Sequence, residues 1–275
     1  MSQFRTSDGI NLHYLDAGAG PSLVLLHGWS GSAALFKHQL SALRQHFRII
    51  ALDMRGHGHS EKPSYGYRIS RLAKDLRELL EFLDLKHVRL LGHSAGCSVI
   101  WCYWDLYGAE RISKLVLVDQ HPVIVAHPSW TASERQSFGA ILKANELYRL
   151  ADDLAGPNGV ELTETLFSGM MTGAISDEQK RWILDVALQF PRTFAAQLIV
   201  DVATHDWRDT IARLTVPTLI VSGRASQVPW QSQVWMQTQI AGSRLETFDE
   251  TEGGRHFMFL EAPNKFNAVL ADFLG

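Results

Sequence analysis

A serine with one glycine two residues before it and another two residues after it constrains the fold of this chain more than any other sequence feature. Residues 92–96 read Gly-His-Ser-Ala-Gly and fit the pattern G-x-S-x-G. The apolar run 88–91 before them predicts a buried strand, and the stretch after them predicts a helix. So tight a passage from strand to helix strains the backbone at the serine and leaves no room for side chains at the glycines. The pattern therefore predicts a serine hydroxyl that projects above one end of a sheet.

The same five residues allow a simpler interpretation, in which the glycines make a turn and Ser94 only caps the helix. The strand before and the helix after favour the first interpretation, because that pattern needs this context. In that first interpretation, the N–H of Ala95 points toward the negative charge that develops on a substrate oxygen. The N-terminus of the helix adds to this stabilisation.

Short apolar runs alternate with helical patterns along the chain. Strands of a parallel sheet that is covered on both faces have this continuous apolar character. Five runs fit well and a sixth, weaker one is expected at an edge: 23–26, 47–52, 88–91, 115–118, 218–221 and 245–248. Apolar residues at steps of three and four predict helices in 71–85 and near the C-terminus. The alternation predicts a doubly wound, mostly parallel α/β sheet with right-handed crossovers.

One long segment, 125–207, breaks this alternation and contains only helical signals. We expect one helix over 131–151, and a second one that begins with a capping box at Ser176. The segment predicts a helical cap inserted into a core domain formed by 1–124 and 208–275. Its large apolar side chains either pack as core or line a pocket, and Trp130 is a candidate for substrate contact.

The composition excludes several classes of partner. Charged residues make up 20% of the 275 residues and the net charge is -3, so the chain lacks the basic surplus that nucleic acids or anionic membranes attract. We see neither a signal peptide nor an apolar run long enough to span a membrane. Cys97 and Cys102 lie five residues apart on a predicted helix and are not expected to pair. We expect a soluble cytoplasmic protein without metal or cofactor, of undetermined oligomeric state.

Several segments together resemble the α/β-hydrolase superfamily over almost the whole chain. They are residues 27–29, 53–60, 92–96 and 115–119, and His256 on a loop before the final helix. The resemblance is specific for the fold and much less so for the reaction, because this fold hosts many chemistries.

The resemblance also implies roles for residues. Ser94 is expected to be the nucleophile and His256 its base. The loop of His27 and Gly28 would present the N–H of Trp29 as a second donor to an oxyanion, beside the N–H of Ala95. Two alternatives stay open: Trp29 packed as core, and His256 as an ordinary surface histidine.

The chain departs from its relatives at the acid. Most of them carry an aspartate on the loop after the strand that matches 217–223, where this sequence has Ser226. A serine cannot stabilise an imidazolium as a carboxylate does. Asp119, which closes the strand 115–118, is the best replacement, since some relatives use this position. An aspartate also occurs here in relatives whose acid lies elsewhere.

Two reactions fit these residues. The first is hydrolysis of an ester or lactone of a small hydrophobic substrate, aromatic ones included, through Ser94, His256 and Asp119. The second is cleavage of a 3-hydroxy-4(1H)-quinolone ring by oxygen without a cofactor, with His256 and Asp119 as a general base and Ser94 as a hydrogen-bonding group. The intact serine and histidine argue against a third interpretation, a receptor or scaffold without activity.

Overall fold

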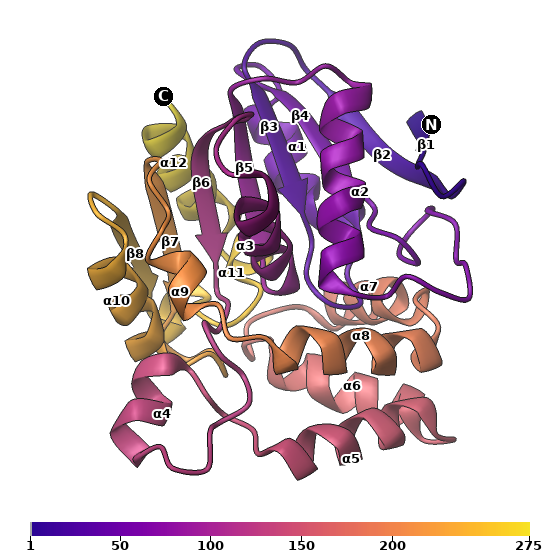
Figure 1. The fold of residues 1–275 in the computed structure, drawn as a ribbon, viewed down its shortest axis with the longest axis vertical. Helices are drawn as coiled ribbons and strands as arrows, with labels where there is room; N and C mark the ends of the chain where they lie inside the picture. The colour runs from indigo at the N-terminus through magenta and orange to yellow at the C-terminus, as the bar shows by residue number, and fades with distance from the viewer. Residues whose placement is uncertain (1) are drawn as a thin grey trace.

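The computed structural model describes residues 2–275, which are organised around one eight-stranded sheet (Figure 1). The strand order is β1-β2-β4-β3-β5-β6-β7-β8. The strands are β1 (Ser2–Arg5), β2 (Asn11–Ala17), β3 (Ser22–Leu26), β4 (Arg48–Leu52), β5 (Val88–His93), β6 (Ile112–Val118), β7 (Thr218–Gly223) and β8 (Arg244–Phe248). β3 to β8 run parallel, whereas β1 and β2 pair antiparallel at one edge. The predicted mostly parallel α/β sheet is confirmed.

The six predicted strands are all present, and the weak run at 245–248 forms the edge strand β8. The antiparallel strands β1 and β2 were not predicted. In β1 only Phe4 is buried, and β2 carries Asn11, His13 and Asp16 among its apolar residues. Such edge strands lack the continuous apolar run that marks a strand buried on both faces.

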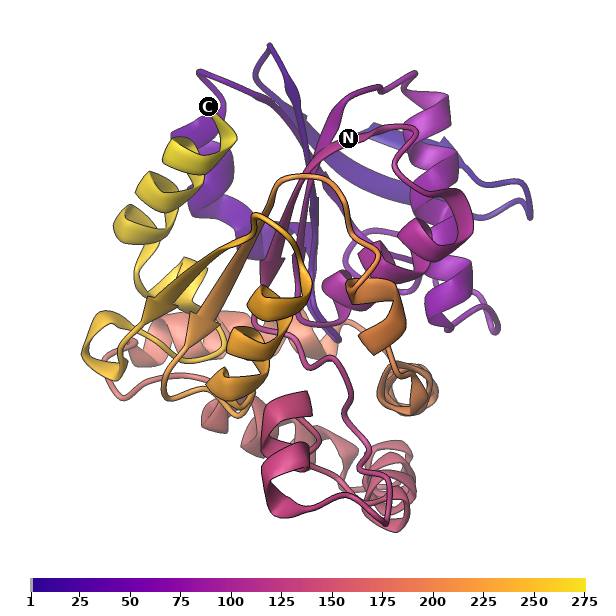
Figure 2. The ribbon, with the colours of Figure 1, turned by 60° about the vertical axis from the view of Figure 1, so that its left-hand side comes forward.

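Helices cover both faces of the sheet (Figure 2). On one face α1 (Lys37–Leu43) packs against α11 (Met258–Glu261) and α12 (Pro263–Leu274). On the other, α3 (Ala95–Tyr107) lies between α2 (Ile69–Phe82) and α9 (Arg208–Ile211). The remaining core elements are the short helices η1 (Ala33–Phe36) and η2 (Glu250–Glu252), and α10 (Trp230–Gln239), which packs on β7 and β8.

Of the six helices between β6 and β7 in the described chain, all but α9 fall within the predicted cap, 125–207. These five are α4 (Ala132–Phe138), α5 (Ala144–Ala155), α6 (Gly159–Gly169), α7 (Asp177–Leu188) and α8 (Arg192–Thr204). Figure 1 shows them beyond the carboxyl ends of the parallel strands. The division into two domains stays a prediction.

Across residues 2–275, no single helix is long and apolar enough to cross a membrane, and only α7 and α8 taken together, bent by 87°, pass that test.

The expectation of one helix over 131–151 is wrong. The chain leaves α4 at Gly139, whose left-handed conformation (φ 77°) ends the helix. The next residues run extended, with a bridge between Val125 and Leu142, before α5 begins. Ser176 caps the start of α7, as half of the predicted capping box requires. Its side chain accepts the N–H of Gln179.

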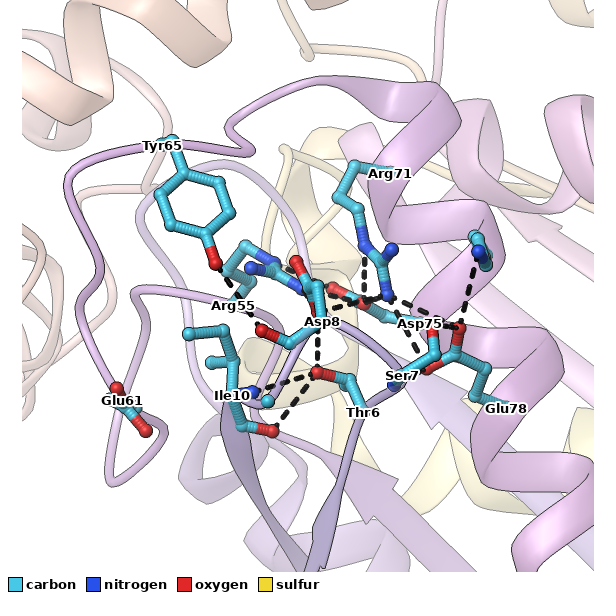
Figure 3. Close-up of polar contacts among 12 residues, drawn as sticks. Thr6, Ser7, Asp8, Ile10, Arg55, Glu61, Tyr65, Arg71, Asp75 and Glu78 are labelled. Atoms are coloured by element: carbon cyan, nitrogen blue, oxygen red, sulfur yellow. Dashed lines mark hydrogen bonds and ion pairs between the residues drawn. The ribbon is translucent and has the colours of Figure 1, made fainter.

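A buried arginine fixes the turn that follows β4 (Figure 3). Arg55 is fully buried, and its Nε and Nη2 both donate to the carboxylate of Asp75 in α2 at 2.9 Å. Nη2 also contacts Asp8, in the loop between β1 and β2, and Arg71 donates to Asp75 as well. Because an unpaired charge in the interior is costly, these bonds hold the turn, α2 and the edge hairpin in one arrangement.

The same turn supports the loop after β3. The N–H of Met54 donates to His27 Nε2 at 3.1 Å, and His27 Nδ1 donates to the carbonyl of Gly28 at 2.8 Å. The ring of His57 lies 4.8 Å from that of His27 and 3.8 Å from that of Phe190, in the cap. Burial, together with the neighbouring His27, holds the pKa of His57 well below its ordinary value. Through these three rings, the loop after β3, the turn after β4 and one segment of the cap pack together in the interior.

The register of the sheet brings three loops together. His93, the last residue of β5, is opposite Val118 of β6, and Val118 is opposite Val221 of β7. Parallel strands present their carboxyl ends at the same edge, so the residues after them become neighbours although they are far apart in the sequence. Ser94, Asp119 and the loop 224–229 therefore begin side by side.

Close packing around the serine turn makes a first prediction. A Cβ at Gly96 would lie 2.4 Å from the carbonyl oxygen of Leu26, whereas a Cβ at Gly169 would meet nothing outside its own helix within 4 Å. We expect Gly96→Ala to lower the free energy of unfolding by about 1–3 kcal/mol through overpacking. Gly169→Ala should change it by less than about 1 kcal/mol. Urea unfolding measures both, and equal stability of the two variants would contradict the geometry.

The buried His57 predicts sensitivity to acid. Its pKa is lowered from 6.5 by folding, so as the pH falls the unfolded chain binds the proton first. The contribution of His57 to stability is therefore complete above pH 6.5 and is lost below it, at up to about 1.4 kcal/mol per pH unit. We expect His57→Asn, which keeps a donor for the Arg55 carbonyl, to make this slope shallower. Urea unfolding at a series of pH values tests this, and the exposed His127→Asn should leave the slope unchanged.

Candidate active site

Ser94 occupies the strained turn that the sequence predicts. Its backbone angles are φ 52° and ψ -125°, in a region that residues with side chains rarely adopt. A Cβ at Gly92 would lie 2.6 Å from the carbonyl carbon of Gly96, and a Cβ at Gly96 would lie 2.4 Å from the carbonyl oxygen of Leu26, which explains why both positions are glycine. Within the described chain, Ser94 stands at the start of α3 without making a side-chain cap bond. Its hydroxyl faces a cavity instead, so the interpretation as a simple helix cap is not supported.

His256 and Asp119 form a buried pair. His256 lies on the loop between η2 and α11, and its Nδ1 donates to Asp119 Oδ2 at 2.7 Å. Because a carboxylate oxygen only accepts, Nδ1 carries a proton, and in the neutral ring Nε2 therefore bears the lone pair. His256 lines the same cavity as Ser94, while Asp119 lies behind it, fully buried.

Three donors hold the carboxylate of Asp119. Besides His256, the hydroxyl of Ser226 donates to Oδ2 at 2.5 Å and the N–H of Gly223 donates to Oδ1 at 3.2 Å. Ser226 is itself fixed, since its oxygen accepts the N–H of Val228. The backbone of Asp119 has a positive φ of 52°, which turns the chain sharply at the end of β6. Ser226, at the position where the resemblance implies an acid, thus donates to the carboxylate of Asp119.

The main chain of His256 is held from both sides. Its carbonyl accepts a hydrogen bond from His93 Nε2 at 2.9 Å, and its N–H donates to the carbonyl of Met170 in the cap at 3.2 Å. Burial, with His256 close by, lowers the pKa of His93 well below its ordinary value, so His93 is neutral. Sequence reasoning missed this function of His93, although its place beside Ser94 in the motif was a signal.

A cavity of about 400 Å³ lies between the carboxyl ends of the strands and the cap. Its walls are mostly apolar, and most of the apolar side chains come from the cap. The lining residues are Gly28, Trp29, Gly31, Leu35, His93, Ser94, Ala95, Gln120, His121, Ile124, Ile141, Leu142, Leu150, Leu154, Thr165, Leu166, Phe167, Gly169, Met170, Ile199, Val202, Ala203, Gln227, His256 and Phe257. Such a cavity suits a small hydrophobic molecule.

The loop after β3 reaches this cavity through Gly28 and Trp29. A Cβ at Gly28 would lie 2.9 Å from Cβ of Ser94, so the loop approaches the serine as closely as a glycine permits. The indole of Trp29 is mostly buried, and its Nε1 donates to the carbonyl of Ala195 in α8 at 2.8 Å. Trp29 therefore both borders the cavity and ties the core to the cap.

Besides Asp119, two predicted site residues do not line the cavity, His27 and Trp130. His27 lies behind the loop, where both of its ring nitrogens bond to main chain, so it positions the loop. Trp130 lies in a separate surface hollow beside His127 and Phe138, and the prediction that it contacts substrate is not supported. The break at Gly139 separates α4 from the rest of the cap, and α4 packs against α10 instead.

The metal-ligating side chains among residues 2–275 do not gather into a cluster. Cys97 and Cys102 are both buried and free, as expected from their spacing. Among residues 2–275, no group of three or more His, Cys, Asp or Glu side chains is arranged to hold a metal ion.

The chain is similar to one protein family and to several known proteins. The family described as alpha/beta hydrolase fold matches residues 21–263. A non-heme chloroperoxidase from Streptomyces lividans is 29% identical over 287 residues, covering 100% of this chain and 99% of that protein. The solved structure of an esterase from Exiguobacterium antarcticum is 28% identical, with a TM-score of 0.90 over 99% of this chain and 98% of that one.

A solved enol-lactonase from Burkholderia xenovorans LB400 shares the fold, with a TM-score of 0.83 and 23% identity over 99% of each chain. The match to the family extends from before β3 to the start of α12 and includes the loops of Gly28, Ser94, Asp119 and His256. The chain therefore belongs to the alpha/beta hydrolase fold family.

Proposed function

We propose that this protein is a serine hydrolase that cleaves an ester or lactone bond of a small hydrophobic substrate through Ser94, His256 and Asp119. The observation that carries the proposal is the 2.7 Å bond from His256 Nδ1 to Asp119, which leaves Nε2 available in the cavity of Ser94. The similarity to an esterase and to an enol-lactonase supports ester and lactone substrates.

The first half of the reaction forms an acyl-enzyme. His256 Nε2 takes the proton of Ser94 as the serine oxygen bonds to the substrate carbonyl carbon, and the carbonyl π electrons move to its oxygen. The N–H groups of Trp29 and Ala95 stabilise that oxyanion, and the start of α3 adds its positive dipole end. Asp119 stabilises the imidazolium. His256 then gives the proton to the leaving alcohol as the bond from carbon to oxygen breaks.

The second half releases the acid. His256 accepts a proton from water, whose oxygen attacks the acyl carbon, and the new tetrahedral intermediate is held by the same two N–H groups. The bond to Ser94 breaks, and the proton on His256 returns to the serine oxygen. With a lactone as substrate, the alcohol and the acid released are two ends of one molecule.

The competing hypothesis of a cofactor-free dioxygenase uses the same pair of His256 and Asp119 as a general base. It requires only a hydrogen bond from Ser94, whereas hydrolysis requires nucleophilic attack by the Ser94 oxygen. The strained turn at Ser94 belongs to a fold that hosts many chemistries, so it fits both hypotheses. Removal of the Ser94 hydroxyl separates them.

We expect Ser94→Ala to lower kcat/KM for 4-nitrophenyl butanoate by about 10⁴-fold or more, because the nucleophile is lost. A fluorophosphonate should label the wild type and not the variant, as measured by intact mass. The exposed Ser129→Ala is the matched control and should behave as the wild type. Oxygen uptake with a 3-hydroxy-4(1H)-quinolone is recorded in parallel. Turnover of the ester by Ser94→Ala within tenfold of the wild type would show that Ser94 is not the nucleophile.

We expect Asp119→Asn to lower kcat by about 10⁴-fold with little change in KM, since an amide at this position favours the wrong tautomer of His256. Ser226→Ala removes one of three donors to the carboxylate and should lower kcat by about 10-fold to 100-fold. Steady-state kinetics with the same ester measures both. If Asp119→Asn is nearly as active as the wild type, the acid lies elsewhere.

A further inference from the structure

Two polar side chains in the cavity have no function in the proposed reaction. Gln120 and His121 follow Asp119 directly, and both line the cavity although they are 3% and 5% exposed. Polar groups in an apolar cavity are costly unless a partner satisfies them, so their free atoms show what the cavity is built to bind.

His121 presents a hydrogen-bond acceptor. Its Nδ1 lies 2.5 Å from the carbonyl oxygen of Gly139, and because a carbonyl only accepts, Nδ1 carries the proton. Burial lowers the pKa of His121 to about 4, which keeps the ring neutral near neutral pH. Nε2 then bears a lone pair. It has no partner among residues 2–275 and is not enclosed by protein atoms, so it opens on the cavity.

Gln120 presents a second acceptor. Its Nε2 donates to Ser98 at 2.9 Å, beneath the cavity wall, which turns the amide so that Oε1 is the free atom. The main-chain carbonyl of Gln120 accepts a bond from Gln233, so the residue is fixed at two points. Within the described chain Oε1 also lacks a partner and is not enclosed, which leaves it facing the cavity.

We propose that Gln120 and His121 form a subsite that binds a hydrogen-bond donor, an O–H or N–H group, on a neutral substrate. This inference rests on the proposed function for the reaction itself and adds the class of substrate. An alcohol, phenol or secondary amide donates its one hydrogen to one of the two acceptors, and a primary amide has a donor for each. An ether or a carboxylate at the same place sets one acceptor against another and leaves buried groups unpaired. Sites of this kind strongly reject analogues that lack the donor.

The subsite is tested first by binding alone. Two neutral ligands, 4-ethylphenol and its methyl ether 4-ethylanisole, differ in that the first has an O–H donor where the second has a methoxy group. With the Ser94→Ala protein in calorimetry, we expect the phenol to bind about tenfold more tightly or better, a ratio that corresponds to one hydrogen bond of about 1.4 kcal/mol. Equal affinities for the two ligands would overturn the proposal.

Variants assign the preference to these residues. His121→Asn keeps a donor for the Gly139 carbonyl but does not reach the cavity, so the preference for the phenol should fall to about twofold or less. The same change at the exposed His127 is the control and should leave the preference intact. Gln120→Met, a change to a side chain of similar volume, should also reduce the preference for the phenol. This variant provides the test if His121→Asn does not fold. A preference unchanged in both variants would overturn the proposal.

Ester kinetics distinguish failure of the subsite from failure of the proposed reaction. We expect the wild type to hydrolyse 4-nitrophenyl 4-hydroxyphenylacetate with a kcat/KM about tenfold above that of its 4-methoxy analogue. Hydrolysis of both esters at equal rates would overturn the subsite and leave the hydrolase standing. A phenol preference that His121→Asn removes, in a protein that hydrolyses neither ester, would support the subsite and contradict the hydrolase.

Discussion

The hydrogen bond between His256 Nδ1 and Asp119 Oδ2 is the interaction on which the site depends. It decides which ring nitrogen carries a proton, and thereby which one is free to act on Ser94 in the proposed reaction. The parallel register brings the ends of β5 and β6 together, which places Asp119 beside His93 and Ser94, and His93 holds the main chain of His256 through its carbonyl. Ser226 and Gly223 complete the environment of the carboxylate from the end of β7 and its loop. Ser226, where the resemblance implies an acid, is thus a hydrogen-bond donor to the carboxylate of Asp119.

Much of the fold was predictable because its signals are local. Apolar runs identified the six parallel strands, and the glycines around Ser94 identified the turn, since each pattern follows from the residues within it. The edge strands β1 and β2 have no such run, and the single helix expected over 131–151 is interrupted at Gly139. Whether a glycine ends a helix depends on what the next residues pack against, which the sequence of one segment does not contain.

The site was predictable only in part, for the same reason. Most of the predicted site residues line one cavity, namely Ser94, Gly28, Trp29, Ala95 and His256. Asp119 lies behind this cavity. Trp130 was misplaced because the packing of α4 on α10 decides its position. The contributions of His93 and His121 depend on bonds to the carbonyls of His256 and Gly139, 163 and 18 residues away. Such partners become visible only once the chain is folded.

The tautomer of His256 tests the central claim most directly. Long-range ¹H–¹⁵N NMR spectra of protein labelled in its histidine rings distinguish a protonated Nδ1 from a protonated Nε2, with His256→Ala used for assignment. The bond to Asp119 predicts that the neutral ring carries its proton on Nδ1 and leaves Nε2 bare, and that this preference is lost in Asp119→Asn. A neutral ring with its proton on Nε2 in the wild type, or a spectrum that Asp119→Asn does not change, would contradict the account.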